Sequence, residues 1–167
     1  SSDLFSEMVK GTCFAAAQNE GAKPILTGIN ISIENGVIQF VGIDGYRLAI
    51  RREKTEVYEN ISFTIANRSL GEVVKLIDEE TDKVEMYIAP RLICFNINGY
   101  TFISRLLEGE FVNYKKTIPS EHTQSVTVNT RDLINTIERV SLLISESFST
   151  PVRCYFNEHS AVFTSAT

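Results

Sequence analysis

Apolar residues recur at helical spacing in two stretches of the first half of the chain. The first stretch runs from Asp3 to Gln18, and Asp3 suits the positive end of a helix dipole. Its apolar positions are Leu4, Phe5, Met8, Val9, Cys13 and Ala16. The second stretch runs from Arg68 to about Glu80, with an apolar stripe formed by Leu70, Val73, Val74 and Ile77. Both patterns predict amphipathic helices that turn one face toward a core.

Short runs rich in β-branched and aromatic residues lie between and after these helices, and turn residues separate them. Strands are expected at residues 25–33, 37–43, 46–51, 61–66, 83–89, 92–98 and 100–107. The tight connections are marked by Glu34-Asn35-Gly36, Asp44-Gly45, Pro90-Arg91 and Asn98-Gly99. The order of helix, strands, helix and strands predicts an α+β fold in which two helices pack on antiparallel sheets.

The opening pattern begins again after a polar connector, residues 110–123. A strand is expected at 125–129, a helix from Asp132 onward, and two further strands at 152–157 and 161–165. The apolar positions of this helix are Leu133, Ile134, Ile137, Val140, Leu143 and Ile144. This order repeats residues 3–42, so a partial second copy of the first domain is expected. The chain stops inside an expected sheet, which favours a fragment of a longer protein.

The composition changes this picture by excluding several classes of protein. Hydrophobic residues make up 43% of the 167 residues, enough to bury a core. No apolar run is long enough to span a bilayer and no export signal begins the chain, so a cytoplasmic location without membrane partners is expected. The net charge of −5 disfavours tight, sequence-specific DNA binding. Free, buried thiols are expected for Cys13, Cys94 and Cys154.

Catalytic and metal-binding patterns are missing from the sequence. His122 and His159 lie in polar, turn-like stretches without metal-ligand spacing to a cysteine or a carboxylate. The acidic residues Glu79, Glu80 and Asp82 lack the alternating ligand positions and the glycine of a calcium loop. We therefore expect no catalytic residues, no metal site and no cofactor.

Two segments attract attention without being decisive alone. Residues 44–48, Asp-Gly-Tyr-Arg-Leu, have the form of a tight turn that returns Leu48 to the core. Residues 111–114, Phe-Val-Asn-Tyr, have the form of a loop with two aromatic side chains.

Taken together and in order, short motifs along essentially the whole chain resemble the bacterial β sliding clamp family, the processivity subunits of the replicative DNA polymerase. The motifs are Phe14-Ala15, Leu26-x-Gly28, Asp44-Gly45-x-Arg47-Leu48-Ala49, Ser104-Arg105-Leu106 with Glu108-Gly109, Phe111-x-x-Tyr114, Ile118-Pro119, and Arg139-Val140-Ser141 with Leu143. The resemblance implies a DNA clamp fold, with residues 1–124 as the central domain and 125–167 as the truncated beginning of the third domain.

The resemblance also implies a function. Two full-length subunits of that family form a ring around duplex DNA, with the helices lining the central hole and the sheets on the rim. DNA-facing cations are then expected at Lys23 and Arg68, whereas Asn67 replaces a second usual cation. Other helical cations, which could equally be solvated surface residues, are Lys10, Lys75, Arg131 and Arg139. The expected location is the bacterial cytoplasm, in association with the nucleoid.

A hydrophobic groove is the second implied property. In the family it captures short peptides of the DNA polymerase III catalytic subunit, the clamp loader and other clamp-binding proteins. The matching positions here are Leu26, Ile43, Gly45, Tyr46, Arg47, Leu48, Val112, Lys116 and Thr117. Ile43 replaces a usual threonine, Val112 a usual proline, and Lys116-Thr117 a usual arginine-valine pair, so the peptide preference differs from that of the family if these positions form the pocket.

Two other classes of function remain open on the sequence alone. A small hydrolase could use Asp44 and a glutamate such as Glu108 as an acid-base pair. A stand-alone nucleic-acid-binding module would need a basic recognition surface.

Overall fold

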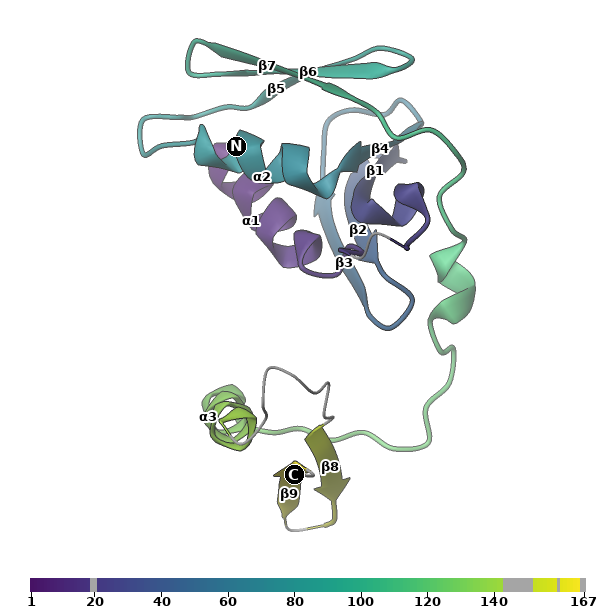
Figure 1. Ribbon diagram of the computed structural model, residues 1–167, viewed down its shortest axis with the longest axis vertical. Coiled ribbons are helices and arrows are strands. Elements are labelled where there is room, and N and C mark those ends of the chain that lie inside the picture. The colour runs from purple at the N-terminus through teal and green to yellow at the C-terminus, as the bar shows by residue number, and fades with distance from the viewer. Residues whose placement is uncertain (19–20, 143–151, 159, 166–167) are drawn as a thin grey trace. The chain divides into compact units, whose positions relative to one another are not determined.

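The computed structural model describes residues 1–18, 21–142, 152–158 and 160–165 (Figure 1). These residues form two compact units, Ser1–Ile118 and Pro119–Thr167. The first unit is an α+β domain with a four-stranded and a three-stranded sheet, both antiparallel.

The four-stranded sheet has the order β3-β2-β1-β4. Its strands are β1 (Gly28–Glu34), β2 (Val37–Ile43), β3 (Leu48–Lys54) and β4 (Ile61–Ala66). Asn35 and Gly36 connect β1 to β2 with φ values of 51° and 73°, the left-handed conformation that a two-residue hairpin turn requires. The pairing sets Val41 opposite Asn30 on one side and opposite Ile50 on the other.

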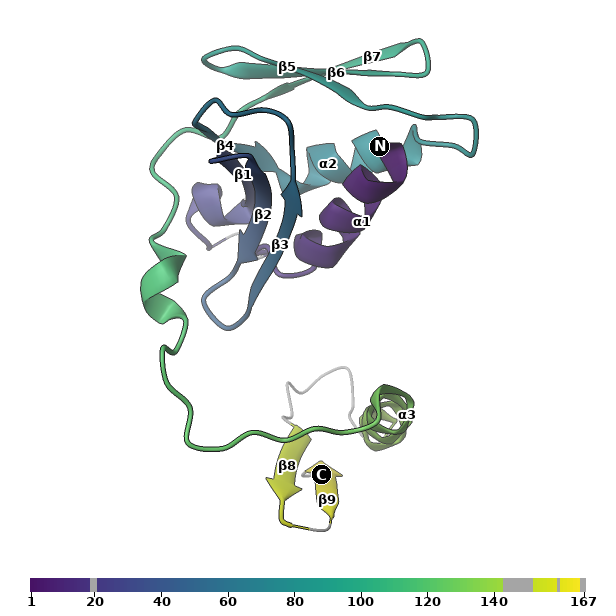
Figure 2. The same cartoon turned by 180° about the vertical axis from the view of Figure 1, so that it is seen from behind.

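Two helices, α1 (Ser2–Cys13) and α2 (Asn67–Lys75), cover one face of this sheet (Figures 1 and 2). The Ser1 side chain caps α1 by accepting a hydrogen bond from the Leu4 N–H, and Asp3 lies in the first turn. The chain of α1 passes so close to β2 that a Cβ atom on Gly42 would lie 2.4 Å from the Thr12 carbonyl oxygen. Only glycine therefore permits this approach.

The second sheet consists of β5 (Glu85–Ile88), β6 (Leu92–Ile97) and β7 (Tyr100–Arg105). It lies across the helices, as both ribbon views show. After β7 the chain returns to the first sheet, where Leu107 N–H donates to the Thr64 carbonyl over 2.8 Å. The two sheets and the two helices thereby enclose one core.

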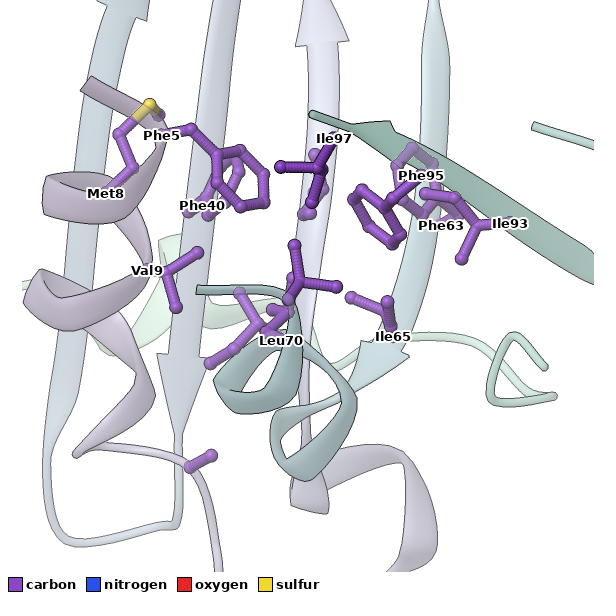
Figure 3. Close-up of a cluster of buried hydrophobic side chains, with 14 residues drawn as sticks. Phe5, Met8, Val9, Phe40, Phe63, Ile65, Leu70, Ile93, Phe95 and Ile97 are labelled. Carbon is purple, nitrogen blue, oxygen red and sulfur yellow. The ribbon is translucent and has the colours of Figure 1, made fainter. Parts of the chain in front are cut away.

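That core is built from apolar side chains of every layer (Figure 3). The Phe5 ring of α1 meets Phe40 of β2 and Phe95 of β6 edge-on, with centroids 5.8 and 6.0 Å apart. We call these residues the inner cluster, and its buried members are Phe5, Met8, Val9, Ala16, Ile29, Ile31, Phe40, Phe63, Ile65, Leu70, Val73, Ile93, Phe95 and Ile97. Burial of each large side chain contributes roughly 1.5–3 kcal/mol, which makes this cluster the main source of stability.

The second unit contains α3 (Thr130–Ser141) and a hairpin of β8 (Val152–Phe156) and β9 (Ala161–Ser165). The Asn129 side chain caps α3 by accepting from the Arg131 and Asp132 N–H groups. The Phe156 and Phe163 rings pack edge-on at 5.8 Å. A helix followed by a hairpin also opens the first unit, and α1 and α3 are both 12 residues long.

The α+β class and the antiparallel pairing agree with the sequence prediction, and the strands at 37–43, 61–66 and 161–165 have the predicted bounds. The predicted strand at 25–33 begins too early. Residues Pro24–Thr27 instead form a 3-10 turn, η1, because Pro24 has a fixed φ and the Thr27 hydroxyl donates to the Pro24 carbonyl over 2.7 Å.

The first two predicted helices, at 3–18 and 68–80, extend too far. Helix α1 ends at Cys13 rather than Gln18, because Ala17 N–H leaves the helical ladder and donates to the Leu26 carbonyl over 2.9 Å. Helix α2 ends at Lys75 rather than Glu80. Residues 78–81 instead form a separate turn, in which the Asp78 carboxylate accepts hydrogen bonds from the Thr81 hydroxyl and the Glu80 N–H.

Two further predictions are wrong in the described chain. Residues 125–129 form no strand, because an alternating pattern needs a hydrogen-bonding neighbour and none of the described strands pairs with them. The thiols are free but not fully buried, since Cys13 and Cys94 are half-buried and Cys154 is exposed. The predicted positions Leu143, Ile144 and His159 lie outside the described residues.

Candidate functional site

The face of the four-stranded sheet that turns away from the helices carries a smaller apolar cluster. Val41, Ile43 and Tyr114 are its buried members. The half-buried side chains packed against them are Leu26, Leu48, Ile50, Phe111 and Val112. We call these eight residues the outer cluster. It brings together four predicted groove positions: Leu26, Ile43, Leu48 and Val112.

Strand register explains how part of this cluster forms. Ile43 pairs with Leu48, and Val41 pairs with Ile50, so β2 and β3 present two adjacent apolar rows. Successive side chains of a strand alternate between faces, and Phe40, between these positions, belongs to the inner cluster. Leu26 joins from η1. The remaining members come from residues 111–114.

The turn at the end of these rows is fixed by Asp44. One of its carboxylate oxygens accepts from the Tyr46 and Arg47 N–H groups over 2.9 and 3.0 Å, and the other accepts from Arg47 Nε over 2.9 Å. The backbone hydrogen bonds of Arg47 and then Tyr46 hold the pKa of this carboxyl below its usual value. Gly45 has a φ of 96°, which strains any residue with a Cβ atom.

The turn leaves two predicted groove residues on the surface. Tyr46 is 99% exposed, so its whole ring is available to a partner. The Arg47 guanidinium is 5.9 Å from the centroid of the exposed Phe14 ring and is also paired with Asp44. Both contacts hold Arg47 at the edge of the outer cluster, and Phe14 is a contact that sequence reasoning did not assign to the site.

The last segment at the outer cluster is residues 111–117. They include the short 3-10 turn η2 (Tyr114–Thr117), in which Tyr114 N–H donates to the Val112 carbonyl over 2.8 Å and the Thr117 hydroxyl donates to the Tyr114 carbonyl over 2.7 Å. Lys116 and Thr117 are exposed and do not belong to the outer cluster. The structure therefore brings together only some of the nine predicted positions.

Sequence reasoning missed four members of the outer cluster: Val41, Ile50, Phe111 and Tyr114. A signal for two of them was present, because Val41 and Ile50 lie two residues from Ile43 and Leu48 and strand alternation places them on the same face. Tyr114 depends on a tertiary contact, since the Gln39 side-chain amide donates to its hydroxyl.

The predicted DNA-facing residues Lys23 and Arg68 are both exposed. Gly28 pairs with Ala66, so the segment before β1 and the start of α2 lie at the same end of the sheet. Asn67 has a structural contact, because its side-chain amide donates to the Cys13 carbonyl over 3.0 Å and ties α2 to α1. Lys75 is paired with Glu72 at 2.9 Å.

Acid-base chemistry at Asp44 is disfavoured by its surroundings. Both carboxylate oxygens already accept hydrogen bonds within the turn. Glu108 lines a cavity of about 770 Å³ that does not include Asp44. Burial raises the pKa of the Cys13 thiol to about 12, which makes it a poor nucleophile.

No group of three or more histidine, cysteine or acidic residues in the described ranges could hold a metal ion. Nor is any helix there sufficiently long and apolar to cross a membrane.

The fold is that of sliding-clamp structures. A putative DNA polymerase III beta subunit from Eubacterium rectale superimposes with a TM-score of 0.91 over 98% of this chain and 45% of its own, at 27% sequence identity. The DNA polymerase sliding clamp of Bacillus subtilis superimposes with a TM-score of 0.84 over 98% of this chain and 47% of its own, at 26% identity.

Sequence comparison gives the family. The family model for the DNA polymerase III beta subunit, central domain, matches residues 1–113. The beta sliding clamp of Bacillus subtilis is 31% identical over 153 residues, and that of Halalkalibacterium halodurans is 32% identical over 147 residues. These alignments cover 90% and 86% of this chain but only 40% and 38% of the relatives. The chain belongs to the DNA polymerase III beta subunit family.

Proposed function

We propose that this chain is part of a processivity factor, a ring-shaped sliding clamp that encircles duplex DNA and tethers the replicative polymerase and other partners. Membership of the beta subunit family and the clamp fold support this proposal. The chain acts as a scaffold without catalysis, in the bacterial cytoplasm and near the nucleoid. The full-length protein forms a homodimeric ring.

The domain assignment is part of the proposal. Residues 1–124 are assigned to the central domain and residues 125–167 to the beginning of the third domain. The family match to residues 1–113 and the division of the structure after Ile118 support a boundary in this region. The helix and hairpin of the second unit are in keeping with a repeated domain.

The outer cluster is the observation that carries the docking function. Half-buried Leu26, Leu48 and Val112 belong to the same cluster as Ile43, and they can bury a leucine or phenylalanine of a peptide from the polymerase or the clamp loader. Burial of one such side chain contributes roughly 1.5–3 kcal/mol. Ordering the peptide costs about 2–5 kcal/mol, so several such contacts are needed for binding. We expect a net affinity in the micromolar range, which permits partners to exchange.

The turn at residues 44–47 and the segment 111–117 complete this side of the groove in the proposal. Gly45 lets a peptide backbone approach, Tyr46 offers a flat aromatic face, and Arg47 donates to peptide carbonyls. Lys116 and Thr117 contact the flank of the peptide rather than its apolar anchor, because both side chains are exposed.

Weak, sequence-independent contacts with DNA complete the function. Lys23 and Arg68 face the duplex, and few such cations are needed because the ring holds DNA by topology. Each neutralised phosphate adds counterion release, so a strongly basic surface would hinder sliding. The net charge of −5 is in keeping with weak contacts.

A peptide titration tests the docking function. A fluorescently labelled peptide with a Leu-Phe anchor is titrated into the full-length protein and into its Leu48→Ala variant, with fluorescence anisotropy as the signal. We expect the variant to bind about tenfold more weakly, because the loss of apolar contact is about 1.4 kcal/mol.

Leu92→Ala is the matched control, because Leu92 is a partly exposed leucine on the three-stranded sheet. It should leave the affinity unchanged. Equal affinity of the Leu48→Ala variant and the unaltered protein would rule out the outer cluster as the docking site.

A further inference from the structure

A basic pocket adjoins the outer cluster on the same face of the four-stranded sheet. It has a volume of about 240 Å³, and its polar lining is formed by Ser32, Glu34, Gln39, Arg52, Tyr114 and Lys115. Tyr114 belongs to both the pocket and the outer cluster. The apolar surface is therefore continuous with a polar one.

The strand register orders this face from apolar to charged. The rows Ile43–Leu48 and Val41–Ile50 are followed by the row Gln39–Arg52, and Lys54 lies in the next row of the same face, opposite Val37. Arg52 and Lys115 have no carboxylate within ion-pair distance in the described part of the chain. Glu34 is the one acidic residue in the lining, so cations outnumber it even though the whole chain is acidic.

Hydrogen bonds within the pocket orient its donors. A guanidinium group can only donate, so Arg52 Nε binds the Gln39 side-chain oxygen over 2.6 Å, and the Gln39 amide nitrogen faces the Tyr114 hydroxyl. The Tyr114 oxygen thus accepts a hydrogen bond and keeps its own proton to donate. The remaining Arg52 N–H groups and the Lys115 ammonium group are also free to donate, which leaves a site suited to an anion.

We propose that this basic pocket binds an acidic side chain in the flank of the docked peptide, an inference that rests on the proposed docking function. The rows at Ile43 and Gln39 lie four residues apart along β2, or about 13 Å at 3.3 Å per residue. The acidic residue therefore follows or precedes the apolar anchor of an extended peptide by about four residues. The pocket selects partners whose docking segment combines an apolar anchor with an acidic flank.

Paired peptides test this selection. One labelled peptide carries glutamates four residues from a Leu-Phe anchor on both sides, and the other carries glutamines there. In the full-length protein, the double variant Arg52→Gln, Lys115→Gln should bind the glutamate peptide about threefold to tenfold more weakly, as expected for the loss of charge-assisted contacts. Its affinity for the glutamine peptide should not change. Tyr114→Phe removes the hydroxyl donor and keeps the ring, so it should lower the preference for glutamate over glutamine.

Arg51→Gln is the matched control, because Arg51 directly precedes Arg52 in β3 and points to the opposite face, where it pairs with Glu7 and Glu53. It should leave both affinities unchanged. Equal weakening of both peptides by the double variant, or no weakening of either, would overturn the pocket. Weaker association with duplex DNA at unchanged peptide affinities would also overturn it, by assigning these cations to phosphate contacts.

The glutamine peptide separates this inference from the docking function itself. Binding of the glutamine peptide tests the docking groove alone, because this peptide offers no carboxylate to the pocket. That binding should depend on Leu48. Failure of both peptides to bind the unaltered full-length protein would contradict the docking proposal.

Discussion

The two faces of the four-stranded sheet are made from alternate residues of the same strands, but they are covered to different extents. The inner face packs against two helices and a second sheet, and Ile29, Ile31 and Phe40 are fully buried there. In the described part of the chain, the outer face packs against η1 and residues of the segment 111–117, and Leu26, Leu48 and Val112 remain half-buried. The inner face therefore provides stability, whereas the outer face keeps apolar area available for a partner.

The largest expected effect comes from Phe40→Ala on the inner face. Phe40 is fully buried, so its truncation should lower the free energy of unfolding by about 3–5 kcal/mol through lost burial and a cavity. Urea unfolding followed by circular dichroism measures this loss. The exposed Val57→Ala should change the free energy by less than about 0.5 kcal/mol. A loss below about 1 kcal/mol for Phe40→Ala would mean that the inner face is not the main core.

Gly42→Ala tests the close approach of α1 to the sheet. The added Cβ atom would lie 2.4 Å from a backbone oxygen, Thr12 O, which cannot move without shifting the helix. We expect destabilisation of about 1–3 kcal/mol by thermal unfolding. Gly71→Ala is the control, because Gly71 lies within α2, has open space around it and gains helix propensity. Equal stability of the two variants would contradict this packing.

Val41→Ala sharpens the comparison, because Val41 directly follows Phe40 but faces outward. It is fully buried in the outer cluster, so we expect a loss of about 1–2 kcal/mol in the free energy of unfolding. Unlike Phe40→Ala, it should also weaken peptide docking, measured by anisotropy in the folded protein. Unchanged docking would separate Val41 from the proposed groove.

Asp44→Ala should give the smallest effect on stability, and that effect should depend on pH. Folding lowers the pKa of the Asp44 carboxyl, so its ionised form stabilises the fold at pH values above the ordinary pKa of 3.8. This stabilisation is lost as the pH falls through the lowered pKa. The difference in unfolding midpoint between the unaltered protein and the variant should therefore be present at pH 7 and vanish in strong acid. A difference that grows toward acid would mean that the turn does not stabilise the ionised form.

Local patterns allowed much of the fold to be predicted. The runs of β-branched and aromatic residues at 37–43 and 61–66 predicted strands with the observed bounds, because such side chains fit a pleated, half-buried surface. The helix ends could not be predicted in this way. The end of α1 depends on hydrogen bonds to other segments, such as that from Ala17 to Leu26 and that from Asn67 to Cys13. The end of α2 is followed by the turn at Asp78.

The site shows the same division. The chain-wide order of motifs identified the turn at Asp44 to Leu48, and local chemistry explains it, since a carboxylate and a glycine with positive φ suffice to form that turn. The outer cluster depended on the tertiary structure. Tyr114 lies 75 residues from Gln39 in the chain, and only the folded sheet brings them into contact.

The sequence by itself determined the class of fold, the order of the elements and the resemblance to clamps, because short-range periodicity and motif order are written in the chain. The tertiary structure decided which residues share a surface. It placed Tyr114 and Phe111 beside Ile43, left Lys116 and Thr117 outside the outer cluster, and set Arg52 and Lys115 around one pocket. The physical reason is that burial and charge depend on contacts between segments far apart in sequence, which no local pattern specifies.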